Sequence, residues 1–416
     1  MRNNARLVQA AMGLLALGGL CLAEPLPEAK KDRVRGSLDG YELLQVHAQL
    51  RFPDTVPAPI EIDWKLGPDM PLPVKGGVAG VLNEHLVIVP GIGFREFDHV
   101  VQALDLKTMK WAGLPRIPKP PLYTAGAWAR DSILVLSGRG NVAPEVGRSV
   151  QRLRFVEGSW VWDELPPLPG KIWYGSSACV DGRWLAIANG DIGRGVGPDQ
   201  ISRDVWVLDL DHLEEGWETV ARYEHGVMQP LLGGVRGKVY VFGGSRFYPP
   251  LREEATKLLA KGMRYWSNGD LRQKFVYALD LKSRQWTRCA DMPYSRSGGV
   301  ALAYGDRYIL LFGGSNLSRD LESVRPGKSR SHDAKETFNH WKGHHDQVLV
   351  YDTVRDAWSV LSRPMPYGVN NPQATIHGET VYVAGGEPDH WYNRNTEDVV
   401  MIGTIGPAKK LNREKP

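Results

Sequence analysis

The sequence predicts an all-β fold, a six-bladed β-propeller with four antiparallel strands in each blade. Three observations predict it. First, a strand-turn-strand unit recurs six times. Second, most units are followed by a strand with an aspartate near its end and a strand with a tryptophan. Third, the last unit has no fourth strand, whereas an additional strand precedes the first unit. The composition agrees, because 46 glycines and 29 prolines in 416 residues fit many short strands joined by tight turns.

The repeated unit starts with a short strand of small residues, turns, and continues into an apolar strand that ends in glycine. The glycines that end the six units are Gly91, Gly138, Gly190, Gly243-Gly244, Gly313-Gly314 and Gly385-Gly386. Glycine accepts a positive φ, so we expect the chain to leave the second strand sharply at these points. A single four-stranded sheet cannot bury both faces, whereas radial stacking buries each face against the next blade.

Two further marks follow the glycines. The third strand carries an aspartate near its end in four copies, and the fourth strand carries a tryptophan in five copies. These residues are Asp105, Asp209, Asp280 and Asp352, and Trp111, Trp162, Trp217, Trp286 and Trp358. A tryptophan that recurs once per unit indicates packing between blades.

The ends of the chain indicate how the ring closes. Residues 399–402 are expected to form the third strand of the last unit, and no tryptophan-bearing strand follows them. Residues 61–66, which include Trp64, have the pattern of a fourth strand and precede the first unit. We therefore predict that this N-terminal strand completes blade six. The expected organisation is a signal peptide (1–23), an arm with a short helix near 41–49 (24–59), the propeller (60–406) and a tail (407–416).

The N-terminus has the pattern of a secretory signal. Arg2 and Arg6 precede an apolar stretch at 7–22, and Cys21-Leu22-Ala23 forms a small-residue cleavage site. We expect an exported protein, periplasmic or extracellular, that is not embedded in the membrane. One alternative is a membrane anchor, for which the stretch is short against the roughly 20 residues of a span. The other is a lipoprotein through Cys21, with Leu20 where a small residue is required.

Charge and cysteine content narrow the partners. The net charge is +4 and no run of basic residues alternates with aromatic ones, so no nucleic-acid partner is expected. Cys179 and Cys289 lie in different units and form neither a zinc framework nor a disulfide scaffold.

A histidine-rich segment raises the alternative of a metal site. It contains His332, His340, His344 and His345, with Asp333 and Asp346. His340 and His344 have i, i+4 spacing, which suits a metal on a helix. No glutamate follows the first histidine as in the zinc-protease motif. We therefore predict no metal and, since cofactor motifs are lacking, no cofactor.

One end of the propeller is the expected place for a site. Long insertions at 246–273 and 316–346 follow two glycine pairs, and residues 251–260 have a helical pattern. The loop between strands two and three shares a face with the connections between blades, so both insertions should cover that face. The candidate ligand-binding residues there are Arg95, Arg139, Arg194, Arg246, Tyr248, Arg296, Tyr367 and Asn370. Arginines bind carboxylates and aromatic rings stack on sugars, so an anionic sugar or glycan is the expected ligand. The alternative is a set of solvated loop charges.

The repeat as a whole resembles the kelch type of propeller. More narrowly, it resembles the secreted bacterial N-acetylneuraminate epimerase (sialic acid mutarotase) group. Two consecutive blades carry long insertions, Tyr367-Gly368 opens a unit that Gly385-Gly386-Glu387 ends, and Arg394 follows. The resemblance implies an isomerase that interconverts anomers of sialic acid or a related sugar, with Glu387 as proton acceptor and Arg394 as its partner. The segment after Glu387 differs from the group, and the glutamate falls in the sixth unit, which implies a permuted blade order.

Three functions are compatible with this sequence. The first is the epimerase, in which a glutamate removes the anomeric hydroxyl proton and an arginine steadies negative charge. The second is a non-catalytic kelch module that binds a protein or a glycan at the cell envelope. The third is a copper radical enzyme of the galactose oxidase type, which requires a cysteine crosslinked to a tyrosine. Neither Cys179 nor Cys289 has such a context.

Overall fold

A computed structural model describes residues 55–91, 99–136, 138, 144–191, 201–247, 270–315, 344–387 and 397–408. All of them belong to the compact unit Leu38–Pro416. The side chains of 191, 246–247 and 270–272 are not described. The expected signal peptide, the helices near 41–49 and 251–260, and the end of the tail lie outside the described residues.

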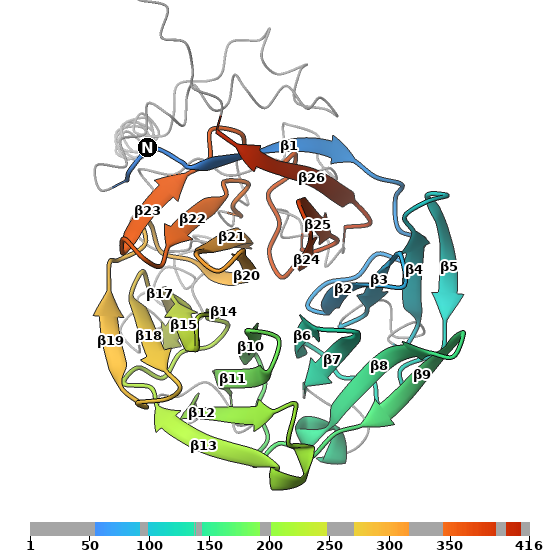
Figure 1. Cartoon of the computed structure of the whole chain (residues 1–416), viewed down its shortest axis with the longest axis horizontal. Helices are drawn as coiled ribbons and strands as arrows, with labels where there is room; N and C mark the ends of the chain where they lie inside the picture. The colour runs from blue at the N-terminus through green and yellow to red at the C-terminus, as the bar shows by residue number, and fades with distance from the viewer. Residues whose placement is uncertain are drawn as a thin grey trace, which may run out of the picture. The chain divides into compact units, whose positions relative to one another are not determined.

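Six four-stranded antiparallel sheets form a ring, as the sequence predicts (Figure 1). Blade one contains β2 (Val78–Leu82), β3 (His85–Val89), β4 (Val101–Asp105) and β5 (Lys110–Leu114). Blade two contains β6 (Ala125–Ala129), β7 (Ser132–Leu136), β8 (Val150–Val156) and β9 (Ser159–Glu164), with η3 (Pro144–Arg148) before β8. Blade three contains β10 (Ser176–Val180), β11 (Trp184–Asp191), β12 (Ile201–Asp209) and β13 (Trp217–Arg222), with η5 (Leu213–Glu215) before β13.

The second half of the ring repeats this order. Blade four contains β14 (Leu231–Val235), β15 (Lys238–Phe242), β18 (Val276–Asp280) and β19 (Trp286–Cys289). Blade five contains β20 (Ser297–Tyr304), β21 (Tyr308–Ser315), β22 (Leu349–Asp352) and β23 (Ala357–Val360). Blade six contains β24 (Gln373–His377), β25 (Thr380–Ala384), β26 (Val400–Pro407) and β1 (Ile60–Leu66). The short ribbon of β16 (Ser245–Phe247) and β17 (Asp270–Arg272) forms the base of the first insertion.

The predicted ring closure is confirmed. β1 pairs with β26 along its whole length, from Ile60 opposite Pro407 to Leu66 opposite Met401. Ile62 is fully buried and Trp64 is nearly so, whereas Lys65 of the same strand is exposed. The N-terminal strand therefore supplies the outer edge of blade six (Figure 1).

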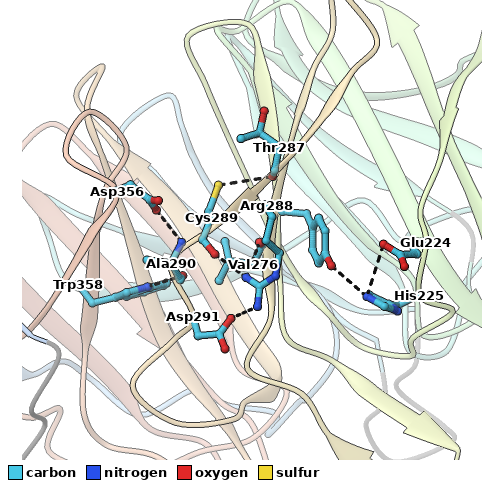
Figure 2. A network of polar contacts seen from close by, with 11 residues as sticks. Glu224, His225, Val276, Thr287, Arg288, Cys289, Ala290, Asp291, Asp356 and Trp358 are labelled. Carbon is cyan, nitrogen blue, oxygen red and sulfur yellow. Dashed lines mark hydrogen bonds and ion pairs between the residues drawn. The ribbon is translucent and has the colours of Figure 1, made fainter.

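The recurring tryptophans join neighbouring blades. In each of five blades the indole Nε1 donates to a backbone carbonyl near the end of the preceding blade's outer strand, at 2.7–3.2 Å. The pairs are Trp111 with Pro68, Trp162 with Pro115, Trp217 with Pro166, Trp286 with Arg222, and Trp358 with Ala290. Figure 2 shows the last of these, where the amide of Ala290 also donates to Asp356.

Trp64 holds the same place in blade six but makes a different contact. It lies opposite Gly403, as Trp111 lies opposite Leu104 in blade one. A Cβ on Gly403 would collide with Ile62 and Val381 and would come within 3.0 Å of the Trp64 ring, so only glycine fits here. The ring then packs edge-on against Phe312 of blade five, at 6.3 Å between centroids.

The recurring aspartates shape the turns between strands three and four. Oδ1 of Asp105 accepts from the amides of Lys107 and Thr108, and Oδ1 of Asp280 accepts from those of Lys282 and Ser283. Asp352 makes the same pair of bonds. Such side-chain bonds to the backbone two and three residues on favour a tight turn, which explains the residue type at this position.

The glycine pairs adopt the expected conformation and also connect the blades. In the last three blades the φ angles of the pairs are 55° and 92°, 60° and 92°, and 59° and 106°. The amide of the second glycine donates to a carbonyl of the next blade at 2.8–2.9 Å; these bonds are Gly244 to Arg296, Gly314 to Val369, and Gly386 to Val74. The last bond joins blade six to the segment before blade one, so a backbone hydrogen bond also connects the two ends of the ring.

Candidate functional site

A central channel of about 450 Å³ runs between the six innermost strands. Its wall is made of β2, β6, β10, β14, β20 and β24, which carry mostly glycine, alanine, serine and valine (Figure 1). Small side chains keep the axis open. Larger polar and aromatic groups line both ends of the channel, with Tyr123, Tyr174 and Gln229 before the inner strands and Trp128, Arg130 and Asp181 at or after their ends.

Six equivalent residues form what we call the channel mouth. Five precede the inner strand of their blade, Gly298 is the second residue of β20, and each has a φ between 48° and 70°; they are Gly76, Tyr123, Tyr174, Gln229, Gly298 and Asn371. Backbone hydrogen bonds run from blade to blade along this circle. The amide of Asn371 donates to Gly298, that of Gly298 to Gln229, that of Gln229 to Tyr174, and that of Gly76 to Asn371, at 2.6–3.0 Å.

The side chains of the mouth divide into two pairs. The rings of Tyr123 and Tyr174 lie 4.6 Å apart between centroids, tilted by 48°. Gln229 Nε2 donates to Asn371 Oδ1 at 2.9 Å. Gln229 and Asn371 are the neighbours of Gly298 on the circle. A Cβ on Gly298 would collide with Asn370 and come within 3.0 Å of Asn371, so glycine leaves space for the two amides. All four side chains are half-buried.

Glu387 lies beside the mouth at the junction of blades six and one. Its Oε1 is 3.3 Å from Lys75 Nζ, and its Oε2 accepts from Asn370 Nδ2 at 3.4 Å. The backbones of Asn370 and Glu387 exchange two hydrogen bonds. The Lys75 side chain is 6% exposed and that of Glu387 is 18% exposed. The arrangement keeps a carboxylate and an ammonium group side by side. Lys75 directly precedes Gly76 of the mouth, and Asn370, which contacts Glu387, directly precedes Asn371.

Two other predicted residues lie in the wall of the propeller. Arg296 is completely buried and donates to the carbonyls of Leu311 and Gln347 and to the Tyr294 hydroxyl. Burial lowers the pKa of its guanidinium. Tyr367 is 5% exposed and belongs to the apolar core between blades five and six. The structure thus brings Asn370 and Glu387 together and places Arg296 and Tyr367 in the interior.

The remaining predicted residues cannot be placed in this site. Arg95, Arg139, Arg194, Tyr248 and Arg394 lie outside the described residues, and Arg246 is described only as backbone in β16. For each of the two insertions, the structure describes the residues where the chain leaves the blade and returns to it. The first starts at the β16–β17 ribbon, and the second leaves at Ser315, which bridges to His344.

Three further residues belong to the site although no sequence motif marks them: Lys75, Gln229 and Asn371. Their signal is positional, because each lies directly before an inner strand, in a connection that must reach the channel mouth. Lys75 is also the residue before the Gly76-Gly77 pair that opens the first unit. A lysine there, in place of the leucine, tryptophan or methionine of the next three blades, departs from the repeat.

The described ranges contain neither a cluster of metal ligands nor a membrane-spanning helix. There, no three histidine, cysteine or carboxylate side chains gather closely enough to hold a metal ion. His344 and His345 are buried at the base of the second insertion. Within the same ranges no helix has the length and apolarity needed to cross a bilayer.

The fold and repeat define this chain as a six-bladed β-propeller. The kelch motif family matches residues 226–293, which span the mouth segment and all four strands of blade four. The solved structure of YjhT covers 82% of the chain and 99% of its own, with a TM-score of 0.56 and 14% identity. That likeness supports the fold.

Curated relatives point more narrowly to one group. N-acetylneuraminate epimerase of Haemophilus influenzae (strain 86-028NP) is 22% identical over 362 residues, which cover 77% of this chain and 88% of the relative. N-acetylneuraminate epimerase of Salmonella enteritidis PT4 is 26% identical over 170 residues, 39% of this chain and 42% of the relative. The chain therefore resembles the epimerases along most of its length, and the Salmonella match spans less than half of that protein.

Proposed function

We propose that this propeller interconverts the anomers of N-acetylneuraminate or a related anionic sugar by acid–base catalysis at Glu387. The observation that carries the proposal is the Lys75–Glu387 pair beside the channel mouth, with its charged atoms 3.3 Å apart. The similarity to N-acetylneuraminate epimerases over 362 residues supports it.

The pair suits the reaction because ring opening requires one group that accepts a proton and one that donates a proton. In a pyranose the anomeric hydroxyl and the ring oxygen are bonded to the same carbon. Glu387 would remove the hydroxyl proton while the bond from this carbon to the ring oxygen breaks, and the ring oxygen would take a proton from Lys75. The open carbonyl form rotates and closes on its other face by the reverse transfers. Asn370, which donates to Glu387 Oε2, would orient the carboxylate.

The test is proton NMR of freshly dissolved α-N-acetylneuraminate with catalytic amounts of protein. We expect anomer exchange faster than in buffer, and a loss of about 10²–10⁴-fold in the catalysed rate for Glu387→Gln, the usual contribution of a general base. Glu379→Gln is the matched control, since Glu379 lies exposed on the turn at the opposite end of the same blade. Exchange no faster than buffer, or an unchanged Glu387→Gln rate, rejects the proposal.

A non-catalytic kelch module is the second candidate. Its support is the kelch match in blade four and the low identity to the epimerases, which leaves room for a changed function on the same fold. Retention of a glycan or protein from envelope extracts, without anomer exchange and without an effect of Glu387→Gln, favours this role.

We also propose export from the cytoplasm through the segment at 1–23. Arg2, Arg6 and the following apolar stretch support it. Mass spectrometry of the protein from its native host should find a mature chain that starts at Glu24. A full-length chain that starts at Met1 in the cytoplasmic fraction contradicts export.

A further inference from the structure

We propose that the channel mouth is the sugar-binding subsite, in which a single pyranose stacks on Tyr123 and Tyr174 and hydrogen-bonds to Gln229 and Asn371. The inference rests on the proposed function for what happens next to the bound sugar. It rests on the mouth alone for where the sugar binds.

Gly76 is the mouth residue that directly follows Lys75, the partner of Glu387. It lies between Asn371 and Tyr123 on the circle, and its amide donates to the carbonyl of Asn371. A Cβ at this position would come within 3.2 Å of Tyr123 Cδ1, so the Tyr123 ring lies against the glycine backbone. The next residue back along the chain is Lys75. A sugar on Tyr123 would thus have one edge over Gly76, next to the Lys75–Glu387 pair.

The tyrosine pair has the properties of a sugar platform. Both rings are half-buried and belong to adjacent blades, with centroids 4.6 Å apart. Tyrosine combines an apolar face with a polar hydroxyl, which matches the C–H face and the hydroxyl rim of a pyranose. The left-handed backbone at both residues, with φ of 50° and 53°, is uncommon for a bulky aromatic residue and marks positions where backbone strain is tolerated.

The amide pair lies on either side of Gly298 on the circle, with Gln229 next to Tyr174 and Asn371 next to Gly76. A primary amide has two donor hydrogens and a carbonyl acceptor. The contact from Gln229 Nε2 to Asn371 Oδ1 engages one donor and one acceptor, so the carbonyl of Gln229 and the NH₂ of Asn371 can serve a ligand. Hydroxyl and acylamino substituents supply the complementary groups. The ligand class is therefore a pyranose with such substituents.

The size of the channel agrees with a monosaccharide. The channel, which all six mouth residues line, has a volume of about 450 Å³, and this falls in the range of small-molecule sites. A pocket that joins an aromatic surface to a few convergent polar groups is the usual form of such a site.

The experiment is a calorimetric titration of the full chain with N-acetylneuraminate, together with KM and kcat for anomer exchange. Loss of one stacking partner in Tyr123→Ala or Tyr174→Ala should raise Kd about three- to tenfold. Tyr123→Phe keeps the ring and should restore most of the affinity. Gln229→Ala should weaken binding without removing exchange. Tyr304→Ala, at the far end of β20, is the control and should leave Kd unchanged.

The outcomes separate the two proposals. Binding that weakens in the tyrosine variants, without exchange in any variant, upholds the subsite and rejects the proposed reaction. Exchange that continues with unchanged KM and Kd in Tyr123→Ala and Tyr174→Ala, both folded by circular dichroism, overturns the subsite and leaves the reaction standing. Failure of the wild-type chain to bind the sugar overturns both.

Discussion

Trp111 Nε1 donates to the carbonyl oxygen of Pro68 at 3.2 Å. Trp111 belongs to blade one, and Pro68 follows the outer strand of blade six. The bond is of the same kind as those between consecutive blades elsewhere in the ring. The two ends of the propeller are therefore joined as two ordinary neighbours are, and the joint depends on β1 staying in place.

Ile62→Ala should destabilise the whole propeller by about 2–5 kcal/mol, because Ile62 is completely buried and its truncation leaves a cavity in the closing strand. Chemical unfolding followed by fluorescence measures the loss. Lys65→Ala is the control, since Lys65 is exposed in the same strand and should change stability by less than about 0.5 kcal/mol. Equal effects from the two variants would mean that β1 is not part of the cooperative unit.

The fold could be predicted because each of its marks is local and repeated. In blade four Gly243-Gly244 ends a strand, Asp280 opens a turn and Trp286 follows six positions later, so a single unit shows all three. The closure of the ring could be predicted because no tryptophan-bearing fourth strand follows residue 402, whereas residues 61–66 have the pattern of one. Sequence could not show that Trp64 would pack on Phe312, because that residue belongs to a different blade.

Gly385→Ala tests the close contact between blades six and one. Gly385 and Gly378 both have a φ of 59° and lie in blade six. A Cβ on Gly385 would collide with the carbonyl oxygen of Val74, whereas one on Gly378 meets nothing within 4 Å. Gly378→Ala should therefore cost only the left-handed backbone, about 1–2 kcal/mol. Gly385→Ala should cost clearly more, measured by thermal unfolding. Equal losses would show that the ring absorbs the clash.

The turn aspartates should make stability fall in acid. Bonds from the amides of Thr108 and Ser283 lower the pKa of Asp105 and Asp280, respectively. A carboxyl whose pKa is lowered by folding stabilises the protein above its unfolded-state value of about 3.9. That contribution disappears as the pH drops from there through the lower folded-state value.

Asp280→Asn keeps an acceptor oxygen but no longer titrates. Between pH 6 and pH 3 it should lose less unfolding free energy than the wild type, as followed by urea titrations at both values. Asp306→Asn, on the exposed turn between β20 and β21, is the control and should follow the wild type. A wild-type pH slope in Asp280→Asn would contradict the prediction.

The candidate site was harder to foresee than the fold. Glu387 and Asn370 could be selected because they flank a glycine pair and a unit boundary. Lys75 could not, because it meets Glu387 only after the first and last blades are brought together, more than 300 positions apart in the sequence. Arg296 was chosen for its charge, yet it occupies a place that is valine or isoleucine in four other blades and is buried like them.

Lys75→Met, Glu387→Gln and their combination should show strong coupling. Each single change leaves one member of a largely buried pair without its opposite charge, which typically costs about 1–3 kcal/mol. The double variant removes both charges and should be more stable than the sum of the single losses predicts, by at least about 1 kcal/mol. Unfolding titrations of the four proteins give this coupling, and additive losses would mean that the ion pair does not stabilise the junction of blades six and one. The same cycle protects the functional test, since a Glu387→Gln protein that is folded but does not exchange anomers has lost its base and not its structure.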